Sequence, residues 1–536
     1  MANAHFTKTP GQRVPRSRHD LSNQVSFTCN VGDLIPAESW SVYPSDDFSI
    51  TPNFMTRLQT LLAPLYDDIH MDCDLFFVPY RLVMDEWAEF MGENTKAKYY
   101  PTKDVFIPQI TGNPQAKSVA DYIGVPINNH SVEFEALIPR AYALIWNEWY
   151  RDQQLQDPIL IDKSSNSHAY DNNNPVYGGK LLKACKYHDY FTSSVPQPQA
   201  GNPVQIPMQA DADFPVYTLD KDVDVSHQTG LKFGVNGTIP VGNHVLGLGS
   251  NSPSVGQVNM SEELTSSSNF LNVFPMNLWA NVHGLPVTDI NSLRLAFATQ
   301  QFLEINNFGT RYTEIIRNHF GVVSPDGRLQ RPELIGHFHD TLNVSQVVQQ
   351  SETGSTPLGD VAGLSATFTH GNTIRKAFTE HGVVLAMVTF RYKHSYQQGL
   401  ARELSRKSKW DFYFPVFANL GEQPILNKEI YLNGTSRDNE VFGYQERWSE
   451  LRHKVDRVAG ELRSTYKTPL DYWTLQDFYK TPPCLDDKWI VEDTAPVNRA
   501  IAISDKTADQ LIVNAYFNTY ATRPIPVYSL PGLTRM

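Results

Sequence analysis

Apolar residues alternate or run together mainly near the two ends of the chain, and these segments predict β-strands. Apolar residues fill every second position from Ile69 to Phe77, with mostly polar residues between them, which predicts a strand with one buried face. The continuous, β-branched apolar run Val383–Phe390 predicts a strand buried on both faces. Further strands are expected over residues 411–417, 488–491, 497–503 and 511–520. We therefore expect N-terminal and C-terminal strands to lie side by side in one sandwich.

Helical periodicity is confined to the long connections between these strand groups. Amphipathic patterns predict helices over residues 81–92, 133–152 and 291–320, the last broken at 306–309. Residues 196–290 are instead rich in Pro, Gly, Asn and Ser, and acidic residues outnumber basic ones. A connection of this length inside a compact domain is normally either disordered or functional. We expect 196–290 to form an exposed β-rich excursion within a single domain, 25–536.

The composition is that of a large folded protein with many turns. Hydrophobic residues make up 41% of the 536 residues and aromatic residues 12%, with 35 Pro and 31 Gly, which argues against global disorder. The polar start of the chain lacks a signal-peptide core, and Val383–Phe390 is far too short to span a membrane. We expect a cytoplasmic protein. Its four widely separated cysteines, Cys29, Cys73, Cys185 and Cys484, are expected to be free, buried thiols.

The formal net charge of −12 restricts how this protein can contact nucleic acid. A protein that coats nucleic acid through charge alone should be basic, so any contact must be confined to one face or one arm. The first candidate is a basic N-terminal arm, residues 1–24. It contains Lys8, Arg13, Arg16 and Arg18 before any acidic residue. The alternative is an ordinary frayed and solvated terminus.

The second candidate is the basic segment that follows the most apolar strand. It contains Arg391, Lys393, Arg402, Arg406, Lys407 and Lys409, with Glu403 as its one acidic residue. Tyr392, Tyr396 and Trp410 are interleaved. Basic residues bind phosphates and aromatic rings stack on unpaired bases, so a contact with DNA is one interpretation of this pattern. A charged rim or a subunit contact would give the same pattern.

Catalytic and metal-binding signatures are absent. The sequence has no GxxxxGK[ST] phosphate loop, no HExxH and no GxSxG elbow. Asp220, Asp222 and Asp224 match only the first spacings of a calcium loop. His337, His339 and Asp340 are metal-ligating types, but no further ligand is marked. We predict no catalytic residue, cofactor or metal site, and no marked carboxylate pair supports the alternative of a polysaccharide-active enzyme.

Several segments resemble those of one viral family, in the same order along the chain. They are Asp74–Val83, Pro139–Asp152, Asp189–Ser193, Gly309–Ile316, His319–Pro332, Tyr396–Leu400, Asp411–Pro415, Leu420–Gln423, Asn427–Tyr431, Val441–Trp448 and Arg523–Gly532. In these segments the chain resembles the major capsid proteins of the gokushovirus group of the Microviridae. The resemblance extends from about residue 20 to the C-terminal segment.

This resemblance implies a fold, an assembly and a set of partners. The expected fold is mainly β: an eight-stranded antiparallel viral jelly roll with long inserted loops that carry a few helices. The expected assembly is a T=1 icosahedral shell of sixty copies around circular single-stranded DNA, built in the bacterial cytoplasm and found in the virion. Small basic DNA-binding, scaffolding and pilot proteins are the expected partners. The family supplies no catalytic residues.

The same resemblance gives the 196–290 excursion a role. It implies that this segment is the group's variable surface insertion, which forms a protrusion near the three-fold axes. A second hypothesis follows, that the insertion binds a host cell-surface receptor, with a glycan as the expected ligand class.

Overall fold

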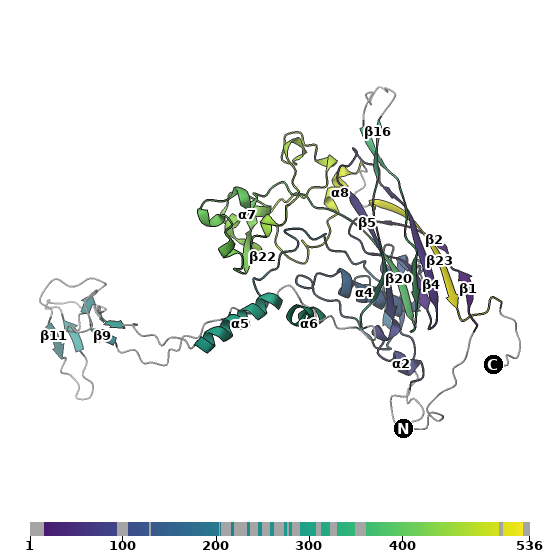
Figure 1. Ribbon diagram of the computed structural model, residues 1–536, viewed down its shortest axis with the longest axis horizontal. Coiled ribbons are helices and arrows are strands. Elements are labelled where there is room, and N and C mark those ends of the chain that lie inside the picture. Colours follow the sequence, from purple (N-terminus) through teal and green to yellow (C-terminus); the bar gives the residue numbers. More distant parts are fainter. Residues whose placement is uncertain are drawn as a thin grey trace. The chain divides into compact units, whose positions relative to one another are not determined.

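The chain folds as two compact units, Gly201–Leu303 and the remainder. The computed structural model describes residues 15–93, 105–127, 130–202, 204, 290–306, 312–321, 330–348, 361–502 and 508–528, together with six short strands between 216 and 280. The larger unit is mainly β, with several antiparallel sheets and few helices (Figure 1). The predicted mainly β class is therefore confirmed. No described helix combines the length and apolar character that crossing a membrane requires.

Two sheets form the centre of the larger unit. The first contains β1 (Ser17–Asp20), β2 (Asn23–Cys29), β4 (Asp47–Leu58), β18 (Thr367–His370), β19 (Ile374–Ala377) and β23 (Leu511–Arg523). The second has the order β15 (Glu333–Thr341), β5 (Ile69–Pro79), β20 (Gly382–Tyr392) and β3 (Ile35–Val42). Apolar side chains from both sheets form one buried cluster. The edge-to-face contact of Trp40 with Phe517, at 5.3 Å between ring centroids, joins β3 to β23 across this core.

β20 is buried on both faces, as its sequence predicted. Val384, Ala386 and Val388 face the core between the two sheets, whereas Val383, Leu385 and Met387 face a second core. The second core is covered by α4 (Leu137–Ile145), which contributes apolar side chains to it. At Gly382, the first residue of β20, a Cβ would lie 2.4 Å from the carbonyl oxygen of Val78 on β5. The close approach of these two strands therefore requires a glycine.

The N-terminal and C-terminal strands pair, which confirms the sequence prediction. Both β1 and β2 are antiparallel to β23, with Ser17 opposite Arg523 and Cys29 opposite Leu511. The described part of the predicted arm, 1–24, contains regular structure, because residues 17–20 and 23–24 form ladders with β23. β4 pairs with the other edge of β23 along nearly its whole length, so β23 lies inside the sheet.

Several local predictions were wrong. β5 was predicted to have one buried face and one mostly polar face, but His70 and Asp72 on the polar face are buried as well. Residues 497–503 were predicted as a strand, yet α8 (Ala495–Ala500) forms there, with proline in its first turn. Residues 488–491 contribute one isolated bridge, Cys185 to Val491. Cys484 is exposed, whereas the other three thiols are buried as predicted, and all four are free.

The remaining elements are short and lie in the long connections. The helices are α2 (Trp87–Phe90), α3 (Val119–Tyr122), α6 (Tyr312–Phe320) and α7 (Asn427–Ile430). The strands are β6 (Gln109–Gly112), β7 (Val132–Glu135), β8 (His168–Ala169), β16 (Val344–Val348), β17 (Val361–Ser365), β21 (Glu422–Leu426) and β22 (Val441–Glu446). The helix predicted over 81–92 is reduced to α2 and one 3₁₀ turn, while 133–152 contains β7, α4 and a π-helical turn, Trp146–Tyr150.

The smaller unit, Gly201–Leu303, overlaps the predicted excursion. Its described strands form three two-stranded sheets. These sheets pair β9 (Val216–Thr218) with β14 (Leu278–Ala280), β10 (Phe233–Val235) with β13 (Val273–Pro275), and β11 (Val245–Leu248) with β12 (Val258–Ser261). α5 (Ile290–Asn306) follows and α6 begins at Tyr312, so two helices are present as predicted, while residues 307–309 of the predicted break lie outside the described residues. Asp220, Asp222 and Asp224 lie outside the described residues.

A buried ion-pair network fixes the chain beyond β20 to the C-terminal segment. The two ring nitrogens of His394 each lie 2.9 Å from a carboxylate, Asp477 at Nδ1 and Glu492 at Nε2. Lys186 forms a third ion pair in this network, with its Nζ atom 3.6 Å from Asp477. Burial lowers the pKa of His394, but Asp477 and Glu492 outweigh burial and raise it to about 9. His394 is therefore an imidazolium at neutral pH.

This network predicts a loss of stability at alkaline pH. A group whose pKa is raised by folding stabilises fully below its ordinary value, here 6.5, and loses that effect as the pH rises through about 9. Between pH 6 and pH 10 the free energy of unfolding should fall on the order of 3 kcal/mol more in the wild type than in His394→Gln. Chemical denaturation across this pH range measures the difference. Parallel curves for both proteins would contradict the assignment.

Candidate nucleic-acid interface

The described part of the predicted basic arm is held against β23. Arg16 donates to the carbonyl oxygen of Thr522 at 3.4 Å, and the Arg18 guanidinium lies 3.9 Å from the centre of the Tyr520 ring. Both side chains remain at the surface. Lys8 and Arg13 lie outside the described residues.

Arg391 lies inside the larger unit, in contact with a buried carboxylate. Its guanidinium is 2.6 Å from Asp72 on β5, 4.0 Å from the centre of the Tyr187 ring and 3.4 Å from the Cys185 carbonyl oxygen. Burial raises the pKa of Asp72, but Arg391 and the donors His339 and Tyr187 outweigh burial and lower it. The main interaction of Arg391 is therefore with Asp72, which sequence reasoning could not identify because the two residues are far apart in the chain.

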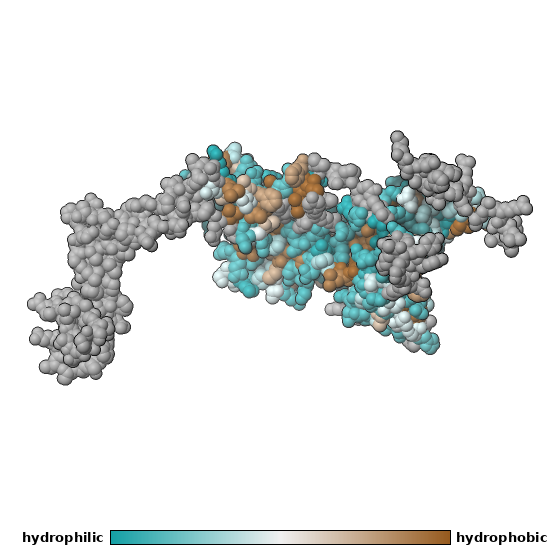
Figure 2. Space-filling model, turned by 90° about the horizontal axis from the view of Figure 1, so that it is seen from below, coloured by the Kyte–Doolittle hydropathy of each residue, from teal (hydrophilic) through white to brown (hydrophobic). Residues whose placement is uncertain are grey.

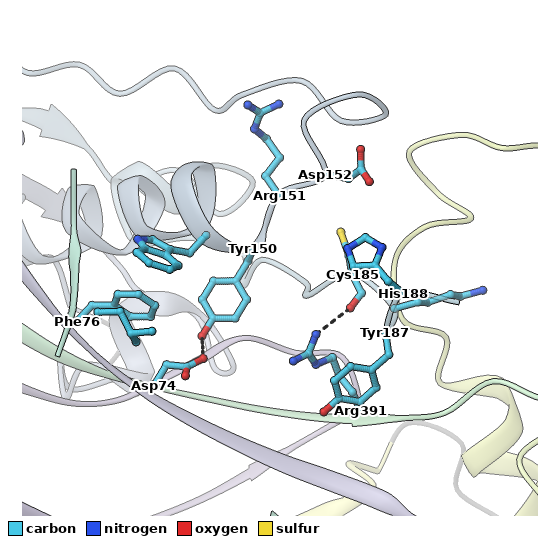
Figure 3. A pocket seen from close by; sticks show the side chains of 12 residues that line it. Asp74, Phe76, Tyr150, Arg151, Asp152, Cys185, Tyr187, His188 and Arg391 are labelled. Atoms are coloured by element: carbon cyan, nitrogen blue, oxygen red, sulfur yellow. Dashed lines mark hydrogen bonds between the residues drawn. The ribbon is translucent and has the colours of Figure 1, made fainter. Parts of the chain in front are cut away.

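Arg391 also lines a cavity of about 240 Å³. Figure 3 shows it with Asp74 and Tyr150 on one side and Cys185, Tyr187 and His188 on the other. The Tyr150 hydroxyl donates to Asp74 at 2.5 Å, which fixes one wall. The cavity thus has charged and aromatic walls that are already hydrogen-bonded to one another.

Arg402 is also engaged internally. Its guanidinium lies 3.0 Å from the buried Glu429 and donates to the carbonyl oxygen of Pro424. This pair joins a 3₁₀ turn, Arg402–Leu404, to α7. The predicted basic cluster therefore divides into internal residues, Arg391 and Arg402, and the four that remain at the surface.

The surface residues belong largely to one segment, 404–420, which we call the aromatic–basic segment. Lys393, Lys407 and Lys409 are exposed, and Arg406 is half-buried. Arg406 lies 4.9 Å from the centre of the Phe412 ring, and Lys409 lies 4.7 Å from that of Trp410. Cations thus flank aromatic rings that face solvent.

The aromatic–basic segment was predicted to contain a strand, 411–417, and that prediction is wrong. Two 3₁₀ turns, Lys409–Asp411 and Pro415–Phe417, replace it. Ser408 caps the first turn with its side chain, and proline opens the second, where its missing N–H is tolerated. Alternation of side chains is lost, so neighbouring apolar residues all reach the surface.

The exposure of these apolar side chains marks the segment as a contact surface. Trp410 is 60% exposed, Phe412 51% and Val416 79%. Hydrophobic residues also gather into patches on the face shown in Figure 2. Covering one such aromatic ring would contribute roughly 2 kcal/mol at about 25 cal/mol per Å². Exposed apolar patches rimmed by charge are typical of sites that bind another macromolecule.

Comparisons with known proteins identify the family. The family model of the phage capsid protein, the F protein, matches residues 7–533. The chain belongs to this capsid protein family. It is 37% identical to capsid protein VP1 of Spiroplasma virus 4 over 99% of this chain and 98% of that protein. It is 35% identical to VP1 of Bdellovibrio phage phiMH2K, over 98% of this chain and 97% of the relative, and 32% identical to VP1 of Chlamydia phage 1, over 99% and 98%.

The family accounts for the absence of a recognisable active site in the sequence. A phage capsid protein is a structural component of the virion, which implies assembly with other copies of the same chain. In this capsid protein the aromatic–basic segment is a described surface where several exposed aromatic rings and cations occur together. Sequence reasoning found its basic residues but missed Phe412, Tyr413, Phe414 and Val416 as surface residues.

Proposed function

We propose that this capsid protein assembles, as an eight-stranded jelly roll, into a T=1 icosahedral shell of sixty copies that encloses circular single-stranded DNA. The strand pairing supports the eight-stranded count. β1 and β2 pair one after the other with β23, and β18 and β19 pair one after the other with β4. Each couple counts as one interrupted strand, so each sheet has four. A jelly roll has two facing sheets joined by Greek-key crossovers, and both sheet orders here skip between distant strands.

The exposed apolar side chains of the aromatic–basic segment carry the proposal that this surface is covered in the virion. We assign the genome as the occupant, because the rings lie next to Arg406 and Lys409. Single-stranded nucleic acid is bound by cations that follow the backbone and by aromatic rings that stack on bases. A neighbouring capsid subunit is the alternative occupant. Its contact with this surface would depend on the aromatic rings but not on the cations.

A local basic surface also reconciles DNA contact with the net charge of −12. Arg16, Arg18, Lys393, Arg406, Lys407 and Lys409 are the described candidates that reach the surface. Lys8 and Arg13 remain candidates on the N-terminal arm. The proposal places these residues on the inner surface of the shell and the acidic residues mainly on the outer surface.

The proposed role of the insertion is host attachment. Gly201–Leu303 is a compact unit separate from the sandwich, which supports a segment that can change without altering the shell subunit. We place it on the outer surface of the virion, bound to a host receptor such as a glycan. Scaffolding, pilot and small basic DNA-binding proteins are the proposed assembly partners.

Electron microscopy of the purified, nuclease-treated protein tests the assembly proposal. We expect uniform closed icosahedral particles, and image reconstruction should give sixty subunits in T=1 symmetry. A monodisperse monomer that stays unassembled after addition of proteins from phage-infected cells would contradict the proposal.

Substitutions in the aromatic–basic segment test the genome contact. Lys407→Ala/Lys409→Ala should leave particles intact but lower their DNA content, measured as the ratio of absorbance at 260 and 280 nm after nuclease treatment. For binding of single-stranded DNA by the purified protein, the slope of log affinity against log salt should fall by about 0.7 for each lost phosphate contact. Lys480→Ala/Lys488→Ala removes two exposed lysines elsewhere and should change neither quantity.

A Trp410→Ala variant separates the two possible occupants of this surface. Particles that form with less DNA support stacking on bases. Loss of particles with unchanged DNA affinity of the subunit would assign Trp410 to a subunit contact and refute its role at the genome.

Deletion of residues 205–289 tests host attachment. With a short Gly–Ser linker in their place, the shell should still assemble, because the sandwich strands all lie outside this range. Adsorption of the virus to host cells, measured as the fraction of particles removed from suspension, should fall to background. Unchanged adsorption would remove the proposed role of the insertion.

A further inference from the structure

A ladder of histidines and carboxylates lies on β5 and β15, on the face turned away from the core between the sheets. In the antiparallel register His337 is opposite Asp74, His339 opposite Asp72, and Thr341 opposite His70. β15 is the edge strand of its sheet. Cross-strand neighbours on one face lie within side-chain contact, so the register gathers three imidazoles and two carboxylates.

The distances within the ladder are short. His337 Nδ1 lies 2.6 Å from Asp74 Oδ1, and His339 Nδ1 lies 2.6 Å from Asp72 Oδ1. The rings of His337 and His339 are stacked with centroids 6.3 Å apart, and His70 stacks on His339 at 5.0 Å. Asp72, His337 and His339 each offer a ligand atom within 4.8 Å of the other two.

We propose that Asp72, His337 and His339 bind a divalent transition-metal ion, of which Zn²⁺ is the representative. Two imidazoles and one carboxylate form a donor set that suits zinc and its neighbours rather than magnesium or calcium. Ligand atoms around one zinc ion lie about 3.3 Å apart, since each bond is about 2.0 Å. The atoms at 2.6 Å must therefore separate slightly.

The two histidines, rather than Asp72, have the space to move apart by this amount. The side chain of His337 is 52% exposed and that of His339 44%, whereas that of Asp72 is 2% exposed. Two donors hold Asp72 Oδ2, the Tyr187 hydroxyl at 2.7 Å and Arg391 at 2.6 Å. They leave Oδ1 directed at His339. A fixed carboxylate and two adjustable imidazoles match the way that outer hydrogen bonds orient metal ligands.

His70 provides an independent observation on the same face. It is 9% exposed, its Nδ1 lies 3.1 Å from the Thr341 hydroxyl, and its Nε2 is buried without a hydrogen-bond partner. Buried ring nitrogens are normally paired. His70 is not one of the three grouped ligands, but its unsatisfied nitrogen, on a ring stacked on His339, shows that the described protein atoms leave polar capacity unfilled on this face.

The prediction of no metal site from sequence is thereby revised. Sequence proximity grouped His337 and His339 with Asp340, but Asp340 is opposite Met71, a core residue. The third ligand lies on β5 instead. A bound ion would join the edge strand β15 to β5 and so would stabilise the edge of the sheet.

Zinc binding by the untagged full-length protein tests the proposal, with Cys484→Ser as the background because that thiol is exposed. Equilibrium dialysis after chelator treatment should give one zinc ion per chain. His337→Gln and His339→Gln should each lower the affinity at least tenfold. His370→Gln removes an exposed histidine on β18 that contacts Asn53 and should bind as the background protein does.

Two further readouts keep the result interpretable. Co²⁺ in place of zinc should give the visible absorption of a low-coordinate site in the background protein and His370→Gln, and should not do so in the two ladder variants. Zinc should raise the Tm of the background protein and of His370→Gln, but should not raise the Tm of the two ladder variants. Equal zinc uptake by all four proteins, or none by the background protein, would overturn the proposal, and circular dichroism of the ladder variants verifies that they are folded.

Discussion

Burial of β20 on both faces is the constraint on which the larger unit depends. One set of its side chains closes the core between the two sheets, and the alternate set closes the core beneath α4. A strand buried in this way leaves no solvated face to its sheet over this region, so a helix and long connections must cover it. Segments between the strands supply part of that covering layer, including α4, Val83 and Val119.

The same burial decides what charged residues on the sheet can do. Asp72 lies on β5 beside β20 and is removed from water, which makes a cationic partner necessary. Arg391, at the end of β20, meets that need with hydrogen bonds and contact with the Tyr187 ring. A residue that looks available for phosphate is thus held by the fold. Beyond β20, Arg402 also pairs with a buried carboxylate, that of Glu429. The described contacts of Arg406 and Lys409 are instead with aromatic rings.

Sequence patterns predicted the elements whose burial is regular. β20 was evident because its apolar run is continuous, β23 was predicted over residues 511–520, and pairing of terminal strands followed from their positions. The strand prediction at 411–417 was wrong because local features favour turns there. Ser408 caps one 3₁₀ turn and Pro415 begins the next, although the composition is typical of a strand. Long-range pairs were out of reach: Arg391 and Asp72 are 319 residues apart, and His339 and Asp72 are 267 apart. Only the register of β5 with β15 and β20 brings them together.

The pairing of β23 with β1, β2 and β4 has a consequence for how a chain reaches its folded state. Cys29 and Leu511 are neighbours across one ladder, so a ribosome adding roughly 5–20 residues per second takes on the order of half a minute or more to supply the partner of β2. Contacts of such high sequence separation also form slowly after synthesis. Until then β2 and β4 lack the strand that lies between them. An unfinished chain consequently cannot present the completed sandwich to other copies, and the order of synthesis itself separates folding from association.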